Sequence, residues 1–487
     1  MLTYSFENLG GTSLYEHLYD SIKNDILSGK LLPDYKLPSK RTFAKNLGIS
    51  TITVENSYAQ LIAEGYIYSI PKKGYYVSDI STIQSSHMLY KQSASSKGTY
   101  KSIKQNIASD LDSLTTQLQD NTASSDVFAD LTSNRTDAST FPFYTWTKIL
   151  KDVSSDNSDE LMTPSPAAGV FKLRQAIANH LSGFRGMNIS YEQVIIGAGT
   201  EYLYSLIIQL LGHDKTFAVE DPGYSKIRRI YESNNVNCMC IPLDNEGINI
   251  RALEESHADI IHLSPSHHYP TGIITPISRR YELLGWAAKD DSRYIIEDDY
   301  DCEFRFYGKP IPSLQSIDMQ DKVIYMNTFT KSLSPTIRIS YMVLPPSLVQ
   351  IFNARLGFYS CTVSNFEQYT LAKFIDDGHF EKHINRMRGL YKKQREYFIN
   401  LIENSRLSNI ATIQALDTGL HFLMKIDTNI PDAILIKKAR ENGLKTAFLS
   451  QYYYDKKLAV EHTLVINYSS VTEEQMQNAV NILCKIL

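Results

Sequence analysis

The chain has 487 residues, too many for one ordinary domain, and its 43% hydrophobic and 21% charged residues are typical of globular proteins. No stretch approaches the roughly 18 consecutive apolar residues of a membrane span, and the N-terminus lacks a secretory pattern, so we expect a cytoplasmic protein with no membrane partner. A net charge of −4 argues against a protein coated with nucleic acid, and the five scattered cysteines have no spacing typical of a metal site or a disulfide framework.

Composition divides the chain into three regions. Residues 11–80 show helical apolar periodicity and end in a short aromatic run. Residues 81–125 are rich in Ser, Thr, Gln and Lys, which predicts a linker with some helical character around SIKQNIASDLDSLTTQL. In residues 126–487 apolar strand-like runs alternate with amphipathic helical ones, which indicates an α/β domain with a mostly parallel sheet.

The first region begins with a predicted amphipathic helix. Leu14, Leu18, Ile22 and Ile26 recur every four residues and form one apolar stripe, and Gly29 is a stop signal for this helix.

Two further helices are joined by a very short turn. One fits SKRTFAKNLG, and the next follows the cap residue Ser50, with Val54, Tyr58 and Leu61 on its buried face. Two aromatic runs then flank a Pro-Lys-Lys-Gly turn in YIYSIPKKGYYV, which is typical of a β-hairpin. This order of elements predicts a mainly α winged helix-turn-helix.

The charge of this region favours DNA binding. Between Lys36 and Lys73 six basic residues accompany two acidic ones, a local charge of +4. In a winged helix-turn-helix the third helix enters the major groove, and the residues of its first turns that are candidates to reach bases or phosphates are Ser50, Thr51, Thr53, Asn56 and Ser57. The candidates for phosphate contacts are Lys40, Arg41, Lys72 and Lys73. A three-helix protein-interaction module is the alternative.

Four motifs in this region carry a resemblance. The segments LPSKR, NLGIS, TVENSYAQL and AEGYI resemble the GntR-type winged helix, and the similarity extends over nearly the whole length of that domain. The resemblance implies a partner in the form of a double-stranded DNA operator.

In the large region, VIIGAGTEYLYSLIIQLL places a glycine-bearing turn between a strand and a helix. Backbone N–H groups at such a helix start bind phosphate, and Gly199 and Thr200 are the expected contacts. A dinucleotide fingerprint is the alternative, but the third glycine of that pattern is missing.

A second strand, in YIIEDDYDCEF, ends in a series of carboxylates: Glu297, Asp298, Asp299 and Asp301. The carboxyl ends of strands are where open α/β sheets bind ligands. Magnesium is one ligand that suits several carboxylates. Lys331, in MNTFTKSLSP, and Arg338 come at the ends of the following strands, and a solvated loop lysine is the plain alternative for Lys331.

These residue types together match the needs of pyridoxal 5′-phosphate (PLP). Lys331 supplies an amine for a Schiff base with the aldehyde, and Asp298 is an acidic partner that keeps the pyridine nitrogen protonated. Arg338, Thr328 and Thr330 supply donors for the phosphate, together with the GAGT turn.

The same region resembles a known family. EDPGYSKIRRIYE, LSPSHHYPTGIITPISRRYELLGWA, IIEDDYDCEFRFYGKPIPSLQSID and VIYMNTFTKSLSPTIRISYMVLP are similar to the fold-type I, class I/II aminotransferase domain. Behind a GntR-type winged helix this domain is typical of the MocR family of bacterial transcription regulators, and the resemblance covers essentially the whole chain.

The resemblance has implications for the site and the assembly. It implies a large domain over about residues 165–345 and a small domain over about residues 346–487 that also includes the N-terminal segment. It implies that Asp298 pairs with the pyridine nitrogen, Tyr300 with the ring hydroxyl, and that Tyr224 lies against the ring. It also implies a homodimer, for which a head-to-tail domain swap is one arrangement.

Several positions depart from the family pattern. The strand HTLVINYSS lacks the arginine that usually binds a substrate carboxylate, and the nearest arginine upstream is Arg440. Lys226 and His268 stand where family members more often have arginine and glutamine, and a tyrosine is missing near Pro164. Lys226, His268 and His462 are therefore the candidate effector residues, with a plain surface residue as the alternative for His462.

The cofactor residues are thus complete while the substrate contacts differ. The hypothesis is a PLP-dependent transcription regulator that senses a small amine or amino-acid-type effector through aldimine formation at Lys331, with weak or vestigial transaminase activity. A D-amino acid, a peptide or PLP itself fits the effector role equally well. A working aminotransferase with an appended DNA-binding domain and a dimerisation scaffold without PLP chemistry are the alternatives.

Overall fold

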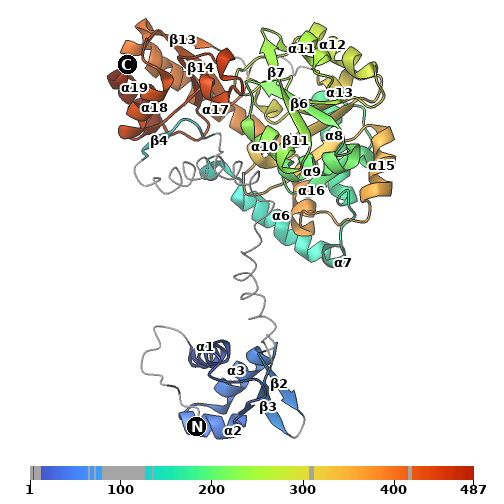
Figure 1. The fold of residues 1–487 in the computed structure, drawn as a ribbon, viewed down its shortest axis with the longest axis vertical. Coiled ribbons are helices and arrows are strands. Elements are labelled where there is room, and N and C mark those ends of the chain that lie inside the picture. The colour runs from blue at the N-terminus through green and yellow to red at the C-terminus, as the bar shows by residue number, and fades with distance from the viewer. Residues whose placement is uncertain are drawn as a thin grey trace, which may run out of the picture. The chain divides into compact units, whose positions relative to one another are not determined.

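The computed structural model describes Tyr4 and residues 13–63, 66–70, 73–78, 127–133, 137–306, 312–414 and 419–487. The chain divides into two compact units, Met1–Gln119 and Asp120–Leu487, and each is described by itself (Figure 1). The predicted linker, residues 81–125, lies outside the described residues.

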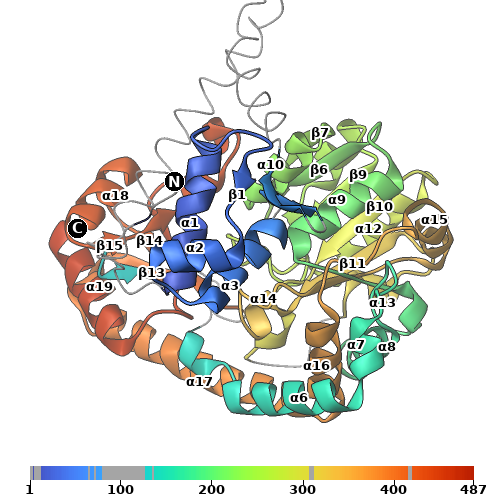
Figure 2. The same cartoon turned by 90° about the horizontal axis from the view of Figure 1, so that it is seen from below.

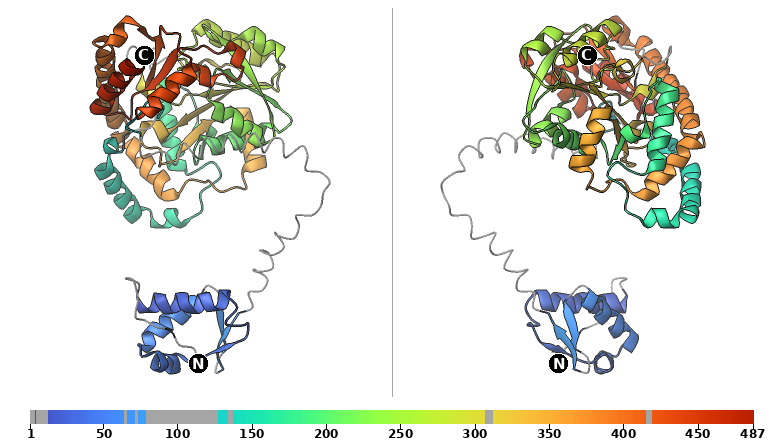
Figure 3. Two further views of the ribbon diagram at one scale, coloured as in Figure 1. Left: turned by 60° about the vertical axis from the view of Figure 1, so that its left-hand side comes forward. Right: turned by 90° about the vertical axis from the view of Figure 1, so that its right-hand side faces the viewer.

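In the described residues of the first unit, helices α1, α2 and α3 accompany a small antiparallel sheet of order β1-β3-β2, and Figure 3 shows these elements together. The helices are α1 (Leu14–Leu27), α2 (Lys40–Leu47) and α3 (Thr51–Ala63). The strands are β1 (Lys36–Leu37), β2 (Ile67–Ile70) and β3 (Gly74–Val77).

Local chemistry sets the turn between α2 and α3. The Ser39 side chain accepts a hydrogen bond from the backbone of Thr42 and caps α2, which ends at Gly48 in the left-handed conformation. The Ser50 hydroxyl accepts from the backbone N–H of Thr53 at 3.0 Å and so caps α3, as predicted. The helix-turn-helix therefore follows from side chains that satisfy helix ends.

The core of this unit confirms most of the predicted apolar stripes. Buried side chains from α1, α2 and α3 pack together: Leu18, Ile22, Ile26, Phe43, Val54, Tyr58 and Leu61. Leu14 is the exception, because it lies in the first turn of α1 and is 40% exposed.

The second unit is built on an eight-stranded sheet of order β5-β12-β11-β10-β9-β6-β7-β8. Its strands are β5 (Val194–Gly197), β6 (Thr216–Asp221), β7 (Asn237–Asp244), β8 (Gly247–Ile248), β9 (Ile260–Leu263), β10 (Tyr294–Asp298), β11 (Val323–Thr328) and β12 (Ser340–Val343). Strands β7, β6, β9, β10 and β11 are parallel, whereas β12 is antiparallel to both neighbours. The predicted α/β class with a mostly parallel sheet is confirmed.

Helices cover both faces of this sheet. Along β11, Tyr325 faces the cluster that includes Leu173 of α8, while Met326 faces the cluster that includes Leu203 of α9. The helices are α6 (Phe143–Asp156), α7 (Ser158–Met162), α8 (Phe171–Arg185), α9 (Thr200–Leu211), α10 (Ser225–Ser233), α11 (Ile250–Glu255), α12 (Ile277–Ala288), α13 (Leu314–Ile317), α14 (Phe329–Ser332), α15 (Pro346–Leu356) and α16 (Asn365–Asp376). Figure 2 shows α6 and α16, which pack against each other, along one edge of the unit.

A smaller subdomain completes the second unit. Figure 1 shows its helices α17 (His379–Glu403), α18 (Asp432–Glu441) and α19 (Glu473–Ile486) grouped with its antiparallel sheet of order β13-β14-β17-β16. These strands are β13 (Ala411–Gln414), β14 (His421–Ile426), β16 (Ala447–Phe448) and β17 (Thr463–Asn467), and a separate pair joins β4 (Ala129–Asp130) to β15 (Leu444–Lys445).

Short 3-10 helices complete the described elements: η1 (Ala138–Thr140), η2 (Tyr191–Gln193), η3 (Cys302–Phe304), η4 (Arg406–Asn409), η5 (Leu449–Tyr452) and η6 (Lys456–Leu458). Within the described parts of the chain, none of the helices has the length and apolar character needed to cross a bilayer.

Tyr58 links the core of the first unit to its sheet. Its buried ring packs against Phe43 and Tyr75, and its hydroxyl donates to the carbonyl of Pro38 at 3.0 Å. We expect Tyr58→Ala to destabilise this unit by about 3–5 kcal/mol and Tyr58→Phe by only about 1 kcal/mol, because the second change removes a hydrogen bond without a cavity. Hydrogen exchange of α1 to α3 in the full chain measures both.

The matched control is Ile52→Ala, because Ile52 is 68% exposed on the same helix. Equal protection factors for Tyr58→Ala and Ile52→Ala would contradict the assigned core.

Candidate functional site

A cavity of about 520 Å³ lies in the second unit, at the carboxyl ends of β6, β9, β10 and β11. The predicted residues that line it are Thr200, Tyr224, Lys226, His268, Asp298, Tyr300, Thr328, Thr330, Lys331 and Arg338. They come from segments far apart in the sequence, which the parallel strands bring to one edge of the sheet. The cavity therefore brings together the predicted cofactor residues other than Gly199, with the effector candidates Lys226 and His268.

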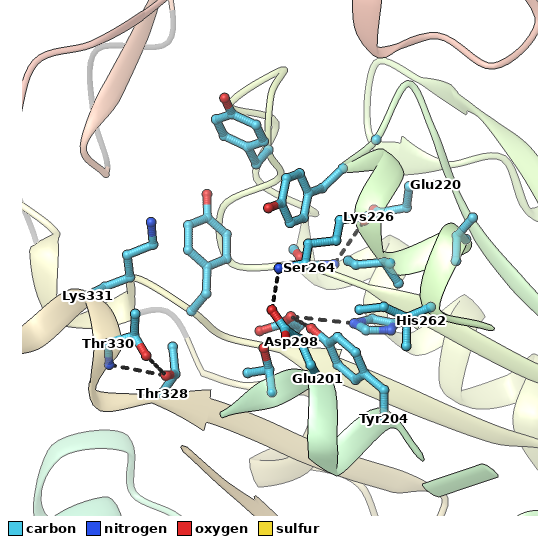
Figure 4. Close-up of a pocket in the computed structure, with 18 of the residues that line it drawn as sticks. Glu201, Tyr204, Glu220, Lys226, His262, Ser264, Asp298, Thr328, Thr330 and Lys331 are labelled. Atoms are coloured by element: carbon cyan, nitrogen blue, oxygen red, sulfur yellow. Dashed lines mark hydrogen bonds and ion pairs between the residues drawn. The ribbon is translucent and has the colours of Figure 1, made fainter. Parts of the chain in front are cut away.

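Asp298 ends β10 as a buried carboxylate held on one side only. Its Oδ2 accepts a hydrogen bond from the Tyr204 hydroxyl at 2.8 Å, and His262 Nε2 lies 3.5 Å from the same oxygen (Figure 4). Tyr231 in turn bonds Nδ1 of His262 at 2.7 Å. The other oxygen, Oδ1, is buried and has no hydrogen-bond partner among the described residues. A buried carboxylate oxygen without a donor suits a ligand that brings an N–H.

Lys331 enters the cavity from the short helix α14, directly after β11 (Figure 4). Burial lowers the pKa of its amine to about 8, and the nearby negative charge of Asp301 opposes this shift only partly. At pH 7 roughly a tenth of such an amine is neutral, compared with less than a thousandth for an ordinary lysine. Lys331 can therefore act as a nucleophile near neutral pH.

A set of donors for an anion lies at the start of α9. Gly199 and Thr200 begin the helix, and Arg338 lies so close that a Cβ on Gly199 would be 2.3 Å from its Nη2. The Thr330 backbone N–H donates to Thr328 Oγ1 at 3.1 Å, which fixes this hydroxyl pair beside the cavity. Arg338 has a φ of +52°, a left-handed conformation that costs free energy for a residue with a side chain. The backbone N–H groups at the start of α9, the two threonine hydroxyls and the Arg338 guanidinium together suit the binding of a phosphate.

The neighbouring carboxylates of the acidic strand point in different directions. Glu297 accepts backbone N–H groups of Leu314 and Gln315 at 2.8 and 3.0 Å. Asp299 is paired with Arg185 and also accepts from the Tyr325 hydroxyl, while Asp301 lies 2.8 Å from His267 Nδ1. In the described ranges no group of three or more His, Cys, Asp or Glu side chains is arranged to hold a metal ion.

Three carboxylates that line the cavity were not predicted: Asp130, Glu201 and Glu220. Glu201, directly after Thr200, forms an ion pair with Lys226 and lies 3.6 Å from Arg338 (Figure 4). Glu220, near the end of β6, accepts from the backbone of Ser264 at 3.0 Å, and burial raises its pKa to about 8. The place of Glu201 in the GAGTEY turn, next to the expected phosphate contacts, could have indicated that it lies in the site. For Glu220 the sequence indicates only that it belongs to a strand.

Tyr224, Tyr300 and His268, which were expected in the site, differ in how deeply they are buried. The Tyr300 hydroxyl lies 3.3 Å from His267 Nδ1, and Tyr224 is half exposed at the cavity mouth. His268 is buried 3.5 Å from Glu220, and burial lowers its pKa to about 3, so it is neutral at pH 7.

The small subdomain brings a lysine to the cavity. Lys445 of β15 lies 3.5 Å from Asp130 of β4, and both line the cavity. His462 is not among the lining residues, because its backbone and ring lie against Asp432. In β17, Val465 is buried in an apolar cluster that packs against Tyr269.

In the first unit, the predicted DNA contacts separate into exposed and occupied side chains. Arg41, Ser50, Thr51, Asn56 and Lys73 are exposed. Lys40 is paired with Glu55 at 2.6 Å and Thr53 with Ser50 at 2.8 Å, while Lys72 lies outside the described residues.

The prediction for Ser57 was wrong. Its side chain is fully buried, and its hydroxyl donates to the carbonyls of Tyr15 and Thr53 at 2.8 and 3.0 Å. Ser57 lies three residues after Val54 and therefore on the buried face of α3. The sequence reading also missed Ile52, which is 68% exposed in the first turn of α3 and suits an apolar contact with a thymine methyl group.

Comparisons with known proteins agree with both units. Residues 127–483 match the family described as aminotransferase class I and II, and residues 14–77 match the bacterial regulatory proteins of the gntR family. The uncharacterized HTH-type transcriptional regulator YdeL of Bacillus subtilis (strain 168) is 37% identical, over 96% of this chain and 95% of the relative. The probable rhizopine catabolism regulatory protein MocR of Rhizobium meliloti is 28% identical, over 96% and 92%.

The fold of the second unit also matches solved structures. The kynurenine aminotransferase of Pyrococcus horikoshii superposes with a TM-score of 0.67 at 23% identity and covers 76% of this chain and 93% of its own. The fold-type I aminotransferase architecture is therefore confirmed. The cofactor of this class is PLP, and the unpaired oxygen of Asp298 and the donors around Gly199 fit its pyridine nitrogen and its phosphate.

The close approach of Gly199 and Arg338 is testable. We expect Gly199→Ala to weaken PLP binding by about 10- to 100-fold, because the new methyl group displaces a charged donor worth about 1.5–3 kcal/mol. Equilibrium dialysis of the full chain against PLP measures the affinity. Gly183→Ala is the control, since a Cβ there meets nothing within 4 Å. Equal affinities for the two variants would contradict the phosphate assignment.

Proposed function

Because the chain belongs to the MocR-type family, in which a GntR-type DNA-binding domain precedes an aminotransferase class I and II domain, we propose that it regulates transcription in response to a small amine or amino-acid-type effector. The observation that carries this proposal is the convergence of Lys331, Asp298 and Arg338 on one cavity in a chain that also has a DNA-binding unit.

Different side chains around the cavity would bind different parts of PLP. When bound, PLP supplies an aldehyde that condenses with amines and a ring that withdraws electrons. Asp298, held in place by Tyr204 and His262, would pair with the pyridine nitrogen. Lys331 offers a partly neutral amine, and Arg338 with the start of α9 would hold the phosphate.

The aromatic and hydroxyl groups of the cavity complete this proposal. Tyr300 would contact the ring hydroxyl and Tyr224 the ring face, in line with the fact that both line the cavity. Thr328 and Thr330 add hydroxyl donors for the phosphate.

The effector end of the cavity supports sensing over ordinary transamination. Strand β17, which lacks the arginine that usually binds a substrate carboxylate, contributes Val465 to an apolar cluster. The small subdomain contributes Lys445 to the cavity lining, and this lysine is paired with Asp130. A lysine is a single point charge, whereas arginine holds a carboxylate with two parallel hydrogen bonds. The chain therefore offers different contacts for an effector, and Lys226 and His268 are further lining residues that could contribute to them.

A homodimer is part of the proposal. Large apolar side chains are exposed at the start of α6 and after α15, where Phe143 is 64%, Tyr144 84% and Phe358 77% exposed. Such side chains are typical of surfaces that a partner covers. A head-to-tail swap of the DNA-binding units rests on the family resemblance.

Regulation requires that the effector bind two conformations of the protein with different affinities. A coupling of about 1–3 kcal/mol, or roughly 5- to 150-fold in operator affinity, is typical. The exposed groups of α2 and α3 then form the operator contacts.

Lys331→Ala tests the proposed function. We expect this variant to bind PLP only in dialysable form and to lose the effect of amine effectors on operator affinity, because the nucleophilic amine is gone. Visible absorption after dialysis and fluorescence anisotropy of an operator duplex measure the two properties. Lys289→Ala is the control, since its side chain is 62% exposed.

The same titrations separate the alternatives. Retention of a borohydride-stable PLP adduct in Lys331→Ala would contradict the assignment of this lysine. Rapid release of a keto acid by the wild-type chain would instead favour a working aminotransferase.

Arg41→Ala tests the DNA-binding surface. We expect weaker binding to a duplex selected with the wild-type chain. The slope of log affinity against log salt concentration should also decrease in magnitude by about one, because one phosphate contact is lost. Anisotropy titrations across a salt series measure both. The control is Lys30→Ala, whose amine pairs with Asp25 at 3.0 Å. An unchanged salt slope for Arg41→Ala would argue against this contact.

A further inference from the structure

An acidic side chain lies where an anion has to bind. Glu201 is the second residue of α9, directly after Thr200, and its Oε2 is 3.6 Å from Nη2 of Arg338. Its other oxygen forms an ion pair with Lys226 (Figure 4). All four of these side chains line the same cavity. The guanidinium expected to bind the phosphate of PLP is therefore already next to a carboxylate.

The charge on Glu201 persists at neutral pH. The hydrogen bond from Lys226 lowers the pKa of this carboxyl below its ordinary value, with the positive charge of Arg338 as a further cause. A phosphate at Arg338 and a carboxylate at the same guanidinium repel each other, because both are anions a few ångströms apart. Binding of the phosphate thus requires Arg338 to exchange one anion for another.

The environment of Glu201 allows this exchange. The side chains of Glu201 and Arg338 are 42% and 47% exposed, so neither is locked by packing. Lys226, 51% exposed, can retain the carboxylate when Arg338 turns to the phosphate. A glutamate that only complemented the helix dipole of α9 would stabilise the helix and leave phosphate binding unaffected.

Building on the proposed function, we propose that Glu201 is an internal competitor for the phosphate site. It holds Arg338 when PLP is absent and so lowers the affinity for the phosphate group. Occupancy of the cavity then follows the concentration of PLP in the surroundings, instead of being saturated at every concentration. Regulation by PLP supply is the consequence for this chain.

The experiment compares three ligands on the full chain: PLP, pyridoxal, which has the same ring and aldehyde without the phosphate, and inorganic phosphate as a competitor. We expect Glu201→Gln to bind PLP about tenfold more tightly and to be inhibited by about tenfold less inorganic phosphate. Its affinity for pyridoxal stays unchanged, because only the phosphate senses the carboxylate. Equilibrium dialysis with absorbance detection measures all three affinities.

Two further variants make the comparison specific. Glu201→Asp keeps the negative charge and is expected to bind PLP with wild-type or nearly wild-type affinity. Glu254→Gln is the matched control, since Glu254 is also a lysine-paired glutamate, 44% exposed, whose partner Lys289 lies outside the cavity lining. This control is expected to leave all three affinities unchanged.

The outcomes distinguish the inference from the proposed function. Tight PLP binding by the wild-type chain with no gain, or a loss, in Glu201→Gln would overturn the role of Glu201 and leave the proposed function standing. An equal gain for PLP and pyridoxal would also overturn it, because the effect would not involve the phosphate. Failure of every variant to bind PLP would overturn both.

Discussion

The buried carboxylate of Asp298 is the constraint on which the second unit depends. A carboxylate oxygen removed from water costs several kcal/mol unless donors surround it, and among the described residues donors reach only one of the two oxygens of Asp298. Tyr204, His262 and Tyr231 form a chain of polar groups behind Asp298, all buried in the core between α9 and the sheet. The unpaired oxygen is left toward the cavity, so the fold is completed by a ligand that carries a proton.

The order of the strands turns this constraint into a site. Strands β10 and β11 are parallel neighbours, so Asp298 and the segment that carries Lys331 emerge at the same edge. Strand β12 lies antiparallel between β11 and β5, with its first residue Ser340 opposite Gly197, so Arg338, just before β12, lies beside the start of α9. Gly199 then allows the guanidinium to approach the helix start, where a side chain would block it. The order of the strands therefore brings three kinds of group to one cavity: the amine of Lys331, the carboxylate of Asp298 and the donors for a phosphate.

The cofactor end and the effector end of the cavity differ in how closely they follow the family. Lys331, Asp298 and Arg338 are all present, whereas the remaining wall carries two ion pairs, Lys226 with Glu201 and Lys445 with Asp130. Paired charges exchange partners when a ligand arrives, and this exchange is a source of differential affinity between conformations. This feature agrees with the proposed role as an effector-responsive regulator, in which ligand binding has to change the protein.

The sequence by itself determined the elements and the chemistry that they carry. Apolar periodicity indicated α1 to α3 and the central strands, and the residue types at the strand ends, Asp298, Lys331 and Arg338, matched the needs of PLP, because side-chain periodicity and residue type are local properties. Tertiary structure decided which side chains face one another. It buried Ser57 against Tyr15, turned His462 to Asp432, and placed Glu201 between Lys226 and Arg338. These contacts join residues that are mostly distant in sequence, and they depend on how helices and strands pack, which no local pattern records.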